Sequence, residues 1–449
     1  MLAVLAACAS SDAAVTTVTP VTRTQAIADV SATAGTAFTL DARTGFAGAS
    51  PTFTVTFSPD ANGLTATSGM ISGTPVAPRP TTVIVTAQNG AGTPAADTFT
   101  VYTFAASLSA PTLPTTSFVY ADAGIGLPAH YLSPGPVAAA DNTPLDNPVT
   151  NAGATLGRVL FYDPRLSAND RVSCSSCHLQ SLGFSDSARF SHGFAGGVTA
   201  RHAMSLGNAR YYTRGKFFWD ERAATLEAQA LQPIQNSVEM GMTLDNLVTK
   251  LKLTSYYAPL FQGAFGSSDI TSDRIGRALA QFVRAMSTYQ SRYDRAVATN
   301  NFGLLSAEEQ LGMQLFMPVA GGVPTVGCDR CHGTAAIISD NVHNNGLDAV
   351  AVDTGAGRGR FKAPSLRNVG LRTSFMHDGR FTTLRQVIDH YNTGVNASPD
   401  LDQRLKNPDG SARRLNLTPQ QEDAIVAFLN TLTDATFISD LKFGNPFAH

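Results

Sequence analysis

The sequences CSSCH at residues 174–178 and CDRCH at residues 328–332 share one pattern: two cysteines three positions apart, with a histidine directly after the second. This is the attachment pattern of a c-type haem, in which both thiols bond covalently to the porphyrin and the histidine supplies an axial nitrogen to the iron. Two CxxC pairs could instead hold zinc, but a histidine after both pairs favours haem. The sequence therefore predicts two covalently bound haems, held by Cys174, Cys177 and His178 and by Cys328, Cys331 and His332.

Covalent haem attachment also implies export, so we expect a periplasmic or cell-envelope protein. The fifth cysteine, Cys8, ends the sequence LAAC, which looks like a bacterial lipoprotein cleavage box. Residues 1–17 would then be a signal and tether, with a lipid anchor on Cys8. The basic start and long apolar core of a signal are missing, so a chance cysteine in a plain signal remnant remains the alternative.

Length and charge limit the remaining classes. A chain of 449 residues is long enough for more than one domain. A net charge of −2 gives no basic field, which argues against a nucleic-acid partner. No later segment is long and apolar enough to span a membrane.

The segment from residue 18 to residue 106 differs from everything after it. Short β-type runs at 37–40, 53–57, 82–87 and 98–102 alternate with turns rich in Gly, Pro, Asn and Asp. This pattern predicts a small antiparallel sandwich. ISGTP at 71–75 and AQNG at 87–90 resemble the putative-Ig family of bacterial surface proteins. We therefore expect an Ig-like β-sandwich that serves as a spacer or an adhesion module, followed by a linker at 107–147.

The rest of the chain has a helical pattern. Helices are predicted at 222–231, 244–253, 272–296, 306–316 and 419–432, the last with Thr418 as its N-cap. With one haem motif in each half, the natural division is two domains, 148–300 and 301–449. The predicted fold is thus multidomain: an all-β Ig-like sandwich followed by mainly α, tandem cytochrome c-type haem domains.

Five further motifs in this helical part carry a specific resemblance. They are LGRVLFYDPRLS at 156–167, FWDERA at 218–223, PIQNSVEMG at 233–241, APSLRNV at 363–369 and MHDGRFTTL at 376–384. Together they make the region from about 147 to 434 resemble the bacterial di-haem cytochrome c peroxidase family, which includes the MauG-type enzymes.

The resemblance implies roles for individual residues near the first haem. The His178 haem would be the peroxide site, with Glu239 as the distal acid that shuttles a proton, and with Gln229 and Pro233 in the distal pocket. Trp219 would lie between the haems. Many family members carry a distal histidine in the loop after the first motif, where this chain offers His192 and His202.

The second haem would be six-coordinate and pass electrons. Tyr391 stands where conventional members carry a methionine ligand and MauG-type enzymes carry tyrosine; His390 and Met376 are the competing ligands. A phenolate favours oxidised iron and would lower the potential. A calcium ion between the domains is also implied, with backbone carbonyls near Arg372 and Ser374. However, His202 stands at the asparagine ligand's position, and imidazole is a poor ligand for a hard cation.

The resulting functional prediction is a di-haem peroxidase that reduces hydrogen peroxide with electrons from a small cytochrome c or a cupredoxin. The first alternative is a MauG-type enzyme that oxidises side chains of a partner protein. The second is a di-haem electron carrier, which would need both irons fully ligated and should bind no cyanide.

Overall fold

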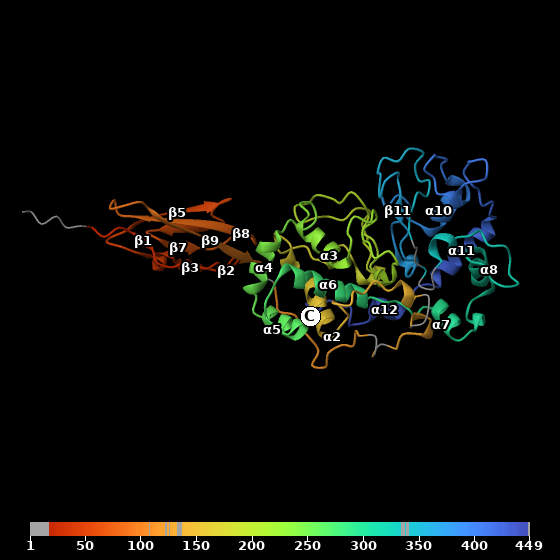
Figure 1. Cartoon of the computed structure of the whole chain (residues 1–449), viewed down its shortest axis with the longest axis horizontal. Coiled ribbons are helices and arrows are strands. Elements are labelled where there is room, and N and C mark those ends of the chain that lie inside the picture. The colour runs from red at the N-terminus through yellow and green to blue at the C-terminus, as the bar shows by residue number, and fades with distance from the viewer. Residues whose placement is uncertain are drawn as a thin grey trace, which may run out of the picture. The chain divides into compact units, whose positions relative to one another are not determined.

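The computed structural model describes residues 18–447, except 107, 122, 123, 125, 133–136, 334–336 and 338–340. The chain divides into two compact units, Met1–Leu108 and Ser109–His449. The first is rich in β-structure and the second is mainly helical (Figure 1). The predicted lipid anchor at Cys8 lies outside the described residues. Within the described part, no helix has the length and apolar character needed to cross a membrane.

The N-terminal unit contains two main sheets. The four-stranded sheet has the order β2-β9-β8-β5, and the three-stranded sheet has the order β3-β7-β6. The strands are β1 (Thr22–Arg23), β2 (Val30–Thr33), β3 (Phe38–Asp41), β4 (Phe46–Ala47), β5 (Thr52–Ser58), β6 (Leu64–Thr67), β7 (Met70–Gly73), β8 (Pro80–Gln88) and β9 (Ala95–Phe104). All main pairings are antiparallel except β2 with β9, which is parallel.

Alternation along the strands explains why the two sheets share one core. Val83 and Val85 of β8 are fully buried, while the intervening Ile84 is exposed, as expected for a strand with one face covered. They belong to the same hydrophobic cluster as Leu64 and Ile71 of the smaller sheet. The four predicted strands overlap β3, β5, β8 and β9. Strands β6 and β7 were missed because they are short and rich in Thr, Ser and Gly.

The second unit is built from helices joined by long loops. They are α2 (Asn151–Tyr162), α3 (Leu226–Gln235), α4 (Leu244–Lys252), α5 (Tyr257–Phe265), α6 (Ser272–Ala285), α7 (Arg292–Ala298), α8 (Ala307–Phe316), α9 (Asp329–His332), α10 (Leu384–Asp389), α11 (Pro419–Asn430) and α12 (Ala435–Ser439). Two short strands, β10 (Val342–His343) and β11 (Phe361–Lys362), pair antiparallel.

Two of the predicted helices have the wrong bounds. The helix predicted at 222–231 begins only at Leu226, because the Thr225 side chain caps it by accepting from the Ala228 amide. The single helix predicted at 272–296 is in fact two. The backbone leaves the helical region at Met286, and Ser291 then caps α7 through a capping box with Asp294.

Each half of this unit is centred on one tight helix crossing. α2 packs on α6 in the first half, and α8 packs on α11 in the second. Glycine makes both crossings possible. A Cβ at Gly157 would lie 2.0 Å from the Ala278 carbonyl oxygen, and one at Gly312 would lie 1.8 Å from that of Ala424. Separate hydrophobic clusters surround the two crossings.

The segment just before α2 packs onto this unit. Tyr120 is 1% exposed and lies in the hydrophobic cluster of the first half. Tyr131 and Val137 are also buried, in a smaller cluster with Tyr211 and Tyr212. The Tyr120 hydroxyl donates to the Lys442 carbonyl at 2.6 Å, so this segment also contacts the end of the described chain.

One turn occurs in both halves of the helical unit with a similar sequence and backbone conformation. FFWDERAATL at 217–226 aligns without gaps with FMHDGRFTTL at 375–384. The backbone agrees: φ is 69° at Phe218 and 71° at Met376, and it is 56° at Glu221 and 63° at Gly379. A threonine caps the following helix in both halves. Continued in the same register, the alignment pairs Trp219 with His377 and Pro233 with Tyr391.

Candidate functional site

The residues predicted for the first haem line one cavity. This cavity, of about 880 Å³, is lined by Cys177, His178, Trp219, Gln229, Pro233 and Glu239, among others. Cys174 lines an adjoining recess together with Cys177, His178 and Glu239. Residues that span 66 positions of sequence, from 174 to 239, therefore meet around one space.

His178 is oriented by its own short turn. Its backbone amide donates to the Cys174 carbonyl at 3.0 Å, which brings the histidine next to the two thiols. Its ring Nδ1 lies 3.0 Å from the Phe184 carbonyl oxygen, a contact that fixes the ring and leaves Nε2 for a metal. Burial lowers the pKa of His178, so the neutral imidazole that a metal needs is favoured. The set of two thiols and one neutral imidazole fits a c-type haem.

Glu239 lies in the turn after α3. The Asn236 side chain accepts from the backbone amides of Val238 at 2.8 Å and Glu239 at 3.2 Å, which shapes the turn. Burial raises the pKa of the Glu239 carboxyl, and the Arg222 charge partly opposes the rise. A carboxyl with a raised pKa beside an open cavity can exchange a proton with a ligand bound there.

The two histidines considered as distal ligands differ in their surroundings. His192 is exposed and lines the recess beside the first cavity. His202 is 4% exposed, and protein groups hold its ring: Nε2 lies 3.2 Å from Ser185 Oγ, and Nδ1 lies 3.2 Å from the carbonyl oxygens of Ala188 and Arg189.

The residues predicted for the second haem line another cavity. It measures about 210 Å³, and Cys328, Cys331, His332 and Tyr391 all line it. Burial lowers the pKa of His332 to about 4, which again favours the neutral imidazole. The donor set therefore fits a second c-type haem, and Tyr391 and Met376 both line the cavity as candidates for its other ligand.

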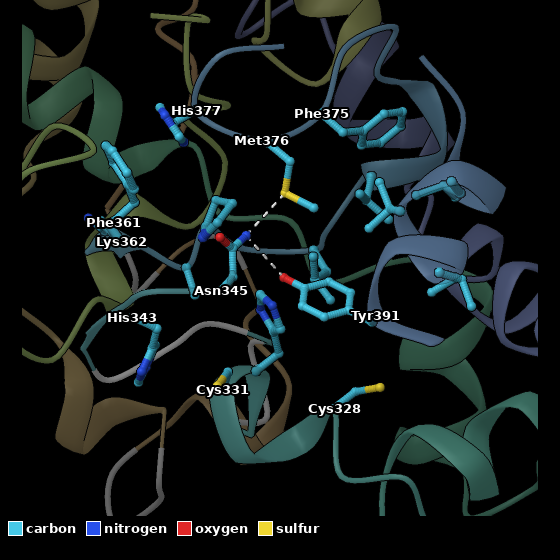
Figure 2. A pocket seen from close by; sticks show the side chains of 18 of the residues that line it. Cys328, Cys331, His343, Asn345, Phe361, Lys362, Phe375, Met376, His377 and Tyr391 are labelled. Atoms are coloured by element: carbon cyan, nitrogen blue, oxygen red, sulfur yellow. Dashed lines mark hydrogen bonds between the residues drawn. The ribbon is translucent and has the colours of Figure 1, made fainter. Parts of the chain in front are cut away.

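Tyr391 lies in η10 (His390–Gly394), a π-helical turn that continues α10. Such turns occur frequently at functional sites. Figure 2 shows Asn345 between Met376 and Tyr391, two of the three candidate ligands. Its Nδ2 donates to the Tyr391 hydroxyl at 3.5 Å and to the Met376 sulfur at 3.4 Å, while its carbonyl oxygen lies 3.0 Å from Nε2 of His390. The His390 nitrogen is thus directed at the backbone. Burial raises the pKa of Tyr391 to about 12.

Trp219 forms part of the wall of both cavities. Its indole Nε1 donates to the His202 carbonyl at 2.8 Å, and its own carbonyl accepts from the Lys362 amide at 2.8 Å. The His377 ring, its counterpart in the repeat, lies 6.5 Å away between centroids. His377 in turn stacks on Phe361 at 3.6 Å.

Several residues of the site were missed from the sequence. Asn345 carries no motif of its own. His343, Asp402 and Arg404 form a cluster at the second cavity: His343 Nδ1 lies 2.6 Å from Asp402, and an Arg404 nitrogen lies 3.1 Å from the same Nδ1. Lys362 is buried beside Trp219, and burial lowers its pKa to about 7. The similarity between 217–226 and 375–384 could have revealed from the sequence that Trp219 and His377 occupy corresponding positions.

The calcium ion that the resemblance implies would lie near His202 and the backbone carbonyls of Arg372 and Ser374. Both ring nitrogens of His202 are occupied by protein groups, as described above. The Arg372 guanidinium is buried at the second cavity and donates to the carbonyl oxygens of Ser365 at 2.6 Å and Arg367 at 3.1 Å. The described residues contain no group of three or more His, Cys, Asp or Glu side chains placed to hold a metal ion.

Most of the helical unit matches the model of one protein family. The family model described as di-haem cytochrome c peroxidase matches residues 151–301 and 306–436. The chain belongs to this family. It is therefore an oxidoreductase with haem c cofactors, and the family predicted from the sequence motifs is confirmed.

Individual relatives include both kinds of enzyme in this family. The methylamine utilization protein MauG of Methylorubrum extorquens is 37% identical over 300 residues, covering 64% of this chain and 80% of the relative. Cytochrome c551 peroxidase of Nitrosomonas europaea is 33% identical over 248 residues, covering 53% and 71%. A solved structure of a MauG-like protein associated with microbial copper homeostasis is 30% identical, has a TM-score of 0.63, and covers 72% of this chain and 99% of that one.

Proposed function

We propose that this chain reduces hydrogen peroxide in the His178 cavity with electrons that enter through the His332 cavity. The bound haems would supply the redox chemistry and the cleavage of the O–O bond. The family membership supports the reaction class, and the two lined cavities support the division of labour between the halves.

One observation carries the assignment of the peroxide site to the first half. In the register of the repeat, Pro233 in the first cavity corresponds to Tyr391 in the second. A tyrosine oxygen can bind iron, whereas proline offers no side-chain donor. The first cavity therefore keeps room for a small ligand, while the second has a protein donor for the same position.

The protein groups around the first cavity supply proton transfer. Peroxide must lose a proton from one oxygen and gain one on the other, and Glu239 is the carboxyl that lines this cavity and has a raised pKa. Gln229 lines the same cavity and can hydrogen-bond a bound oxygen ligand. Trp219 belongs to the wall that the two cavities share, and electrons would cross to this cavity through it.

A second candidate function follows from Tyr391. A tyrosine ligand favours oxidised iron, which suits an enzyme that stores oxidising equivalents and oxidises side chains of a partner protein, as a MauG-type enzyme would. Electrons would then come from that protein substrate. With a conventional peroxidase activity they would come from a small cytochrome c or a cupredoxin.

The first experiment is stopped-flow absorbance of the fully ferric di-haem protein mixed with stoichiometric hydrogen peroxide. A fast, long-lived change of the haem spectrum supports the MauG-type activity. A reaction only after one electron has been added supports a gated peroxidase, with His192 or His202 closing the site. No reaction in either state, together with no binding of cyanide, would support an electron carrier and contradict the proposal.

We further propose that the protein works in the periplasm or cell envelope, with a lipid on Cys8 as its anchor. The β-rich unit would be an Ig-like domain, residues 18–106, that acts as a spacer or adhesion module. Residues 107–147 would link it to an N-terminal haem domain at 148–300 and a C-terminal haem domain at 301–449. Metabolic labelling with a fatty acid, compared between the natural protein and Cys8→Ala, tests the anchor.

A further inference from the structure

Tyr212 and Glu221 form a buried hydrogen-bonded pair beside the first cavity. Tyr212 is 1% exposed and lines that cavity. Its hydroxyl donates to a carboxylate oxygen of Glu221, whose side chain is 5% exposed. A tyrosine hydroxyl with its own buried carboxylate therefore stands at the edge of the space where peroxide would react.

The backbone of Glu221 indicates that the carboxylate is held there at some cost. Glu221 has a φ of 56°, in the left-handed region where glycine is favoured. The same turn of the repeat in the second half carries Gly379, with a φ of 63°. A glutamate in this conformation needs compensating contacts. Arg214 supplies some of them, since its Nε donates to both carboxylate oxygens, at 2.9 and 3.0 Å.

Lys362 connects this pair to the wall between the cavities. Its Nζ lies 3.5 Å from the centroid of the Tyr212 ring, and its backbone amide donates to the Trp219 carbonyl at 2.8 Å. Lys362 and Trp219 both line both cavities. Lys362 thus contacts the Tyr212 ring with its side chain and the Trp219 carbonyl with its backbone.

We propose that Tyr212 is a redox-active tyrosine, a one-electron donor at the first cavity, with Glu221 as its proton acceptor. This proposal rests on the proposed peroxide reaction, because the oxidant would be the peroxide-oxidised haem. In the step, Tyr212 gives up one electron and its O–H bond breaks. The proton forms a new O–H bond on Glu221, leaving a neutral tyrosyl radical and a carboxylic acid. Reduction by an outside donor supplies one electron, and the proton returns from Glu221 to the Tyr212 oxygen, which restores the hydroxyl and the carboxylate.

Physical chemistry explains why the carboxylate matters. A tyrosine hydroxyl has an ordinary pKa near 10, so a buried tyrosine loses an electron readily only if a base takes its proton at the same time. When protonated, the Lys362 amine above the ring disfavours a positively charged tyrosine, because the two charges would repel at short range. Both features direct the proton to Glu221.

Among the described residues, three other tyrosines differ from Tyr212 in this arrangement. Tyr256 and Tyr257 each donate to Asp163 at 2.6 Å, but neither is among the residues lining the two haem cavities or the recess. Tyr211, next to Tyr212 and equally buried, accepts a hydrogen bond from the neutral Ser287 hydroxyl at 3.4 Å. Tyr211 is therefore a matched control.

The test is electron paramagnetic resonance of the di-haem protein, frozen at set times after mixing with hydrogen peroxide in the absence of a donor. The protein contains ring-deuterated tyrosine, which narrows a tyrosyl signal and separates it from a tryptophan radical. The natural protein is compared with Tyr212→Phe, Glu221→Gln, Glu221→Gly and Tyr211→Phe. Glu221→Gly removes the carboxylate but suits the left-handed backbone, so loss of folding should not confuse the result. Haem content is measured for every variant.

We expect a tyrosyl signal that Tyr212→Phe removes, that both Glu221 variants reduce at least tenfold, and that Tyr211→Phe leaves unchanged. A tyrosyl signal that survives Tyr212→Phe, or the absence of one while the haem spectrum changes, would overturn the proposal and leave the proposed function standing. An unchanged haem spectrum would instead contradict the proposed function. In that case, the haem protein is oxidised by a light flash with a ruthenium photosensitiser instead of peroxide. A tyrosyl signal from Tyr212 would support the proposal, and the absence of that signal would contradict it.

Discussion

The indole nitrogen of Trp219 donates a hydrogen bond to the backbone carbonyl of His202 at 2.8 Å, and this bond fixes the orientation of the ring between the two cavities. The His202 amide in turn donates to the His377 carbonyl at 2.8 Å. The tryptophan of one half is thereby connected through His202 to its repeat counterpart in the other half.

Trp219→Phe tests this connection. Phenylalanine keeps an aromatic ring but leaves the buried His202 carbonyl without its donor, which should cost about 1–3 kcal/mol of stability. We expect both haems to be attached and electron transfer between them to slow, because phenylalanine is harder to oxidise than tryptophan. Single-turnover absorbance measures the transfer, and thermal unfolding measures the stability. Transfer at the natural rate would show that Trp219 does not lie on the path.

Tyr391→Met tests the ligand of the second haem. A thioether in place of a phenolate should raise the potential of that haem, on the order of 100 mV within the ~0.8 V range that axial ligands span. Spectroelectrochemistry gives the potential and the ligand spectrum. His390→Ala and Met376→Leu are the controls and should leave the Tyr391-ligated spectrum in place. An unchanged spectrum in Tyr391→Met would identify a different ligand.

Glu239→Gln tests the proton shuttle. Glutamine keeps the shape but cannot exchange a proton, so the rate with peroxide should fall by roughly 100-fold or more, with haem content intact. Gln229→Ala, at the same cavity, should have a smaller effect because a hydrogen bond and not a proton-transfer group is lost. Natural kinetics in Glu239→Gln would remove this residue from the mechanism.

The pH dependence of the same reaction provides an independent check on Glu239. Burial raises its pKa above the usual value for glutamate. As a base it must be deprotonated to accept the peroxide proton, so the rate should rise with pH through that raised pKa and then level off. Glu239→Gln should remove this rise. The raised pKa also affects stability. Between the unfolded and the folded pKa of Glu239, the folded protein binds more protons, so the free energy of unfolding falls as pH increases.

The glycine contacts at the two helix crossings give a prediction about stability alone. Gly157→Ala and Gly312→Ala each push a methyl group against a facing backbone carbonyl, and each should destabilise the protein by about 1–3 kcal/mol in chemical unfolding. Gly263→Ala in α5 is the control. Nothing lies within 4 Å of a Cβ at that position, so the helix should gain stability by roughly 0.5–1 kcal/mol. Equal effects at all three positions would contradict the tight crossings.

How much of the site the sequence could reveal depends on how local each signal is. The haem cysteines and histidines sit in five-residue motifs whose chemistry is nearly self-explanatory, and the family motifs placed Trp219 and Glu239 at the first cavity. Asn345 could not be found in this way, because its contacts with Met376 and Tyr391 join residues far apart in the sequence. Lys362 lies just before a motif that resembled the family, yet a sequence gives no sign that a lysine is buried.

The fold shows the same division between local and distant causes. Strongly patterned strands such as β8 and β9 could be predicted, whereas the short β6 and β7 depend on pairing with β3 and with each other. The break at Met286 was missed because the residues from 272 to 296 contain neither proline nor a second glycine after Gly276. Its cause is the Ser291–Asp294 cap, which starts a new helix and offers the backbone a better set of partners.

The difference between Pro233 and Tyr391 has a consequence for the protein as a device. Two copies of one module, identical in every respect, would have no reason to pass electrons in one direction more than the other. The difference between Pro233 and Tyr391 makes the halves unequal: under the proposed function, the first cavity would admit a molecule from solution, while Tyr391 would fill the corresponding position of the second. Electron flow would then have one direction, because peroxide would react only in the first half and only electrons would enter through the second.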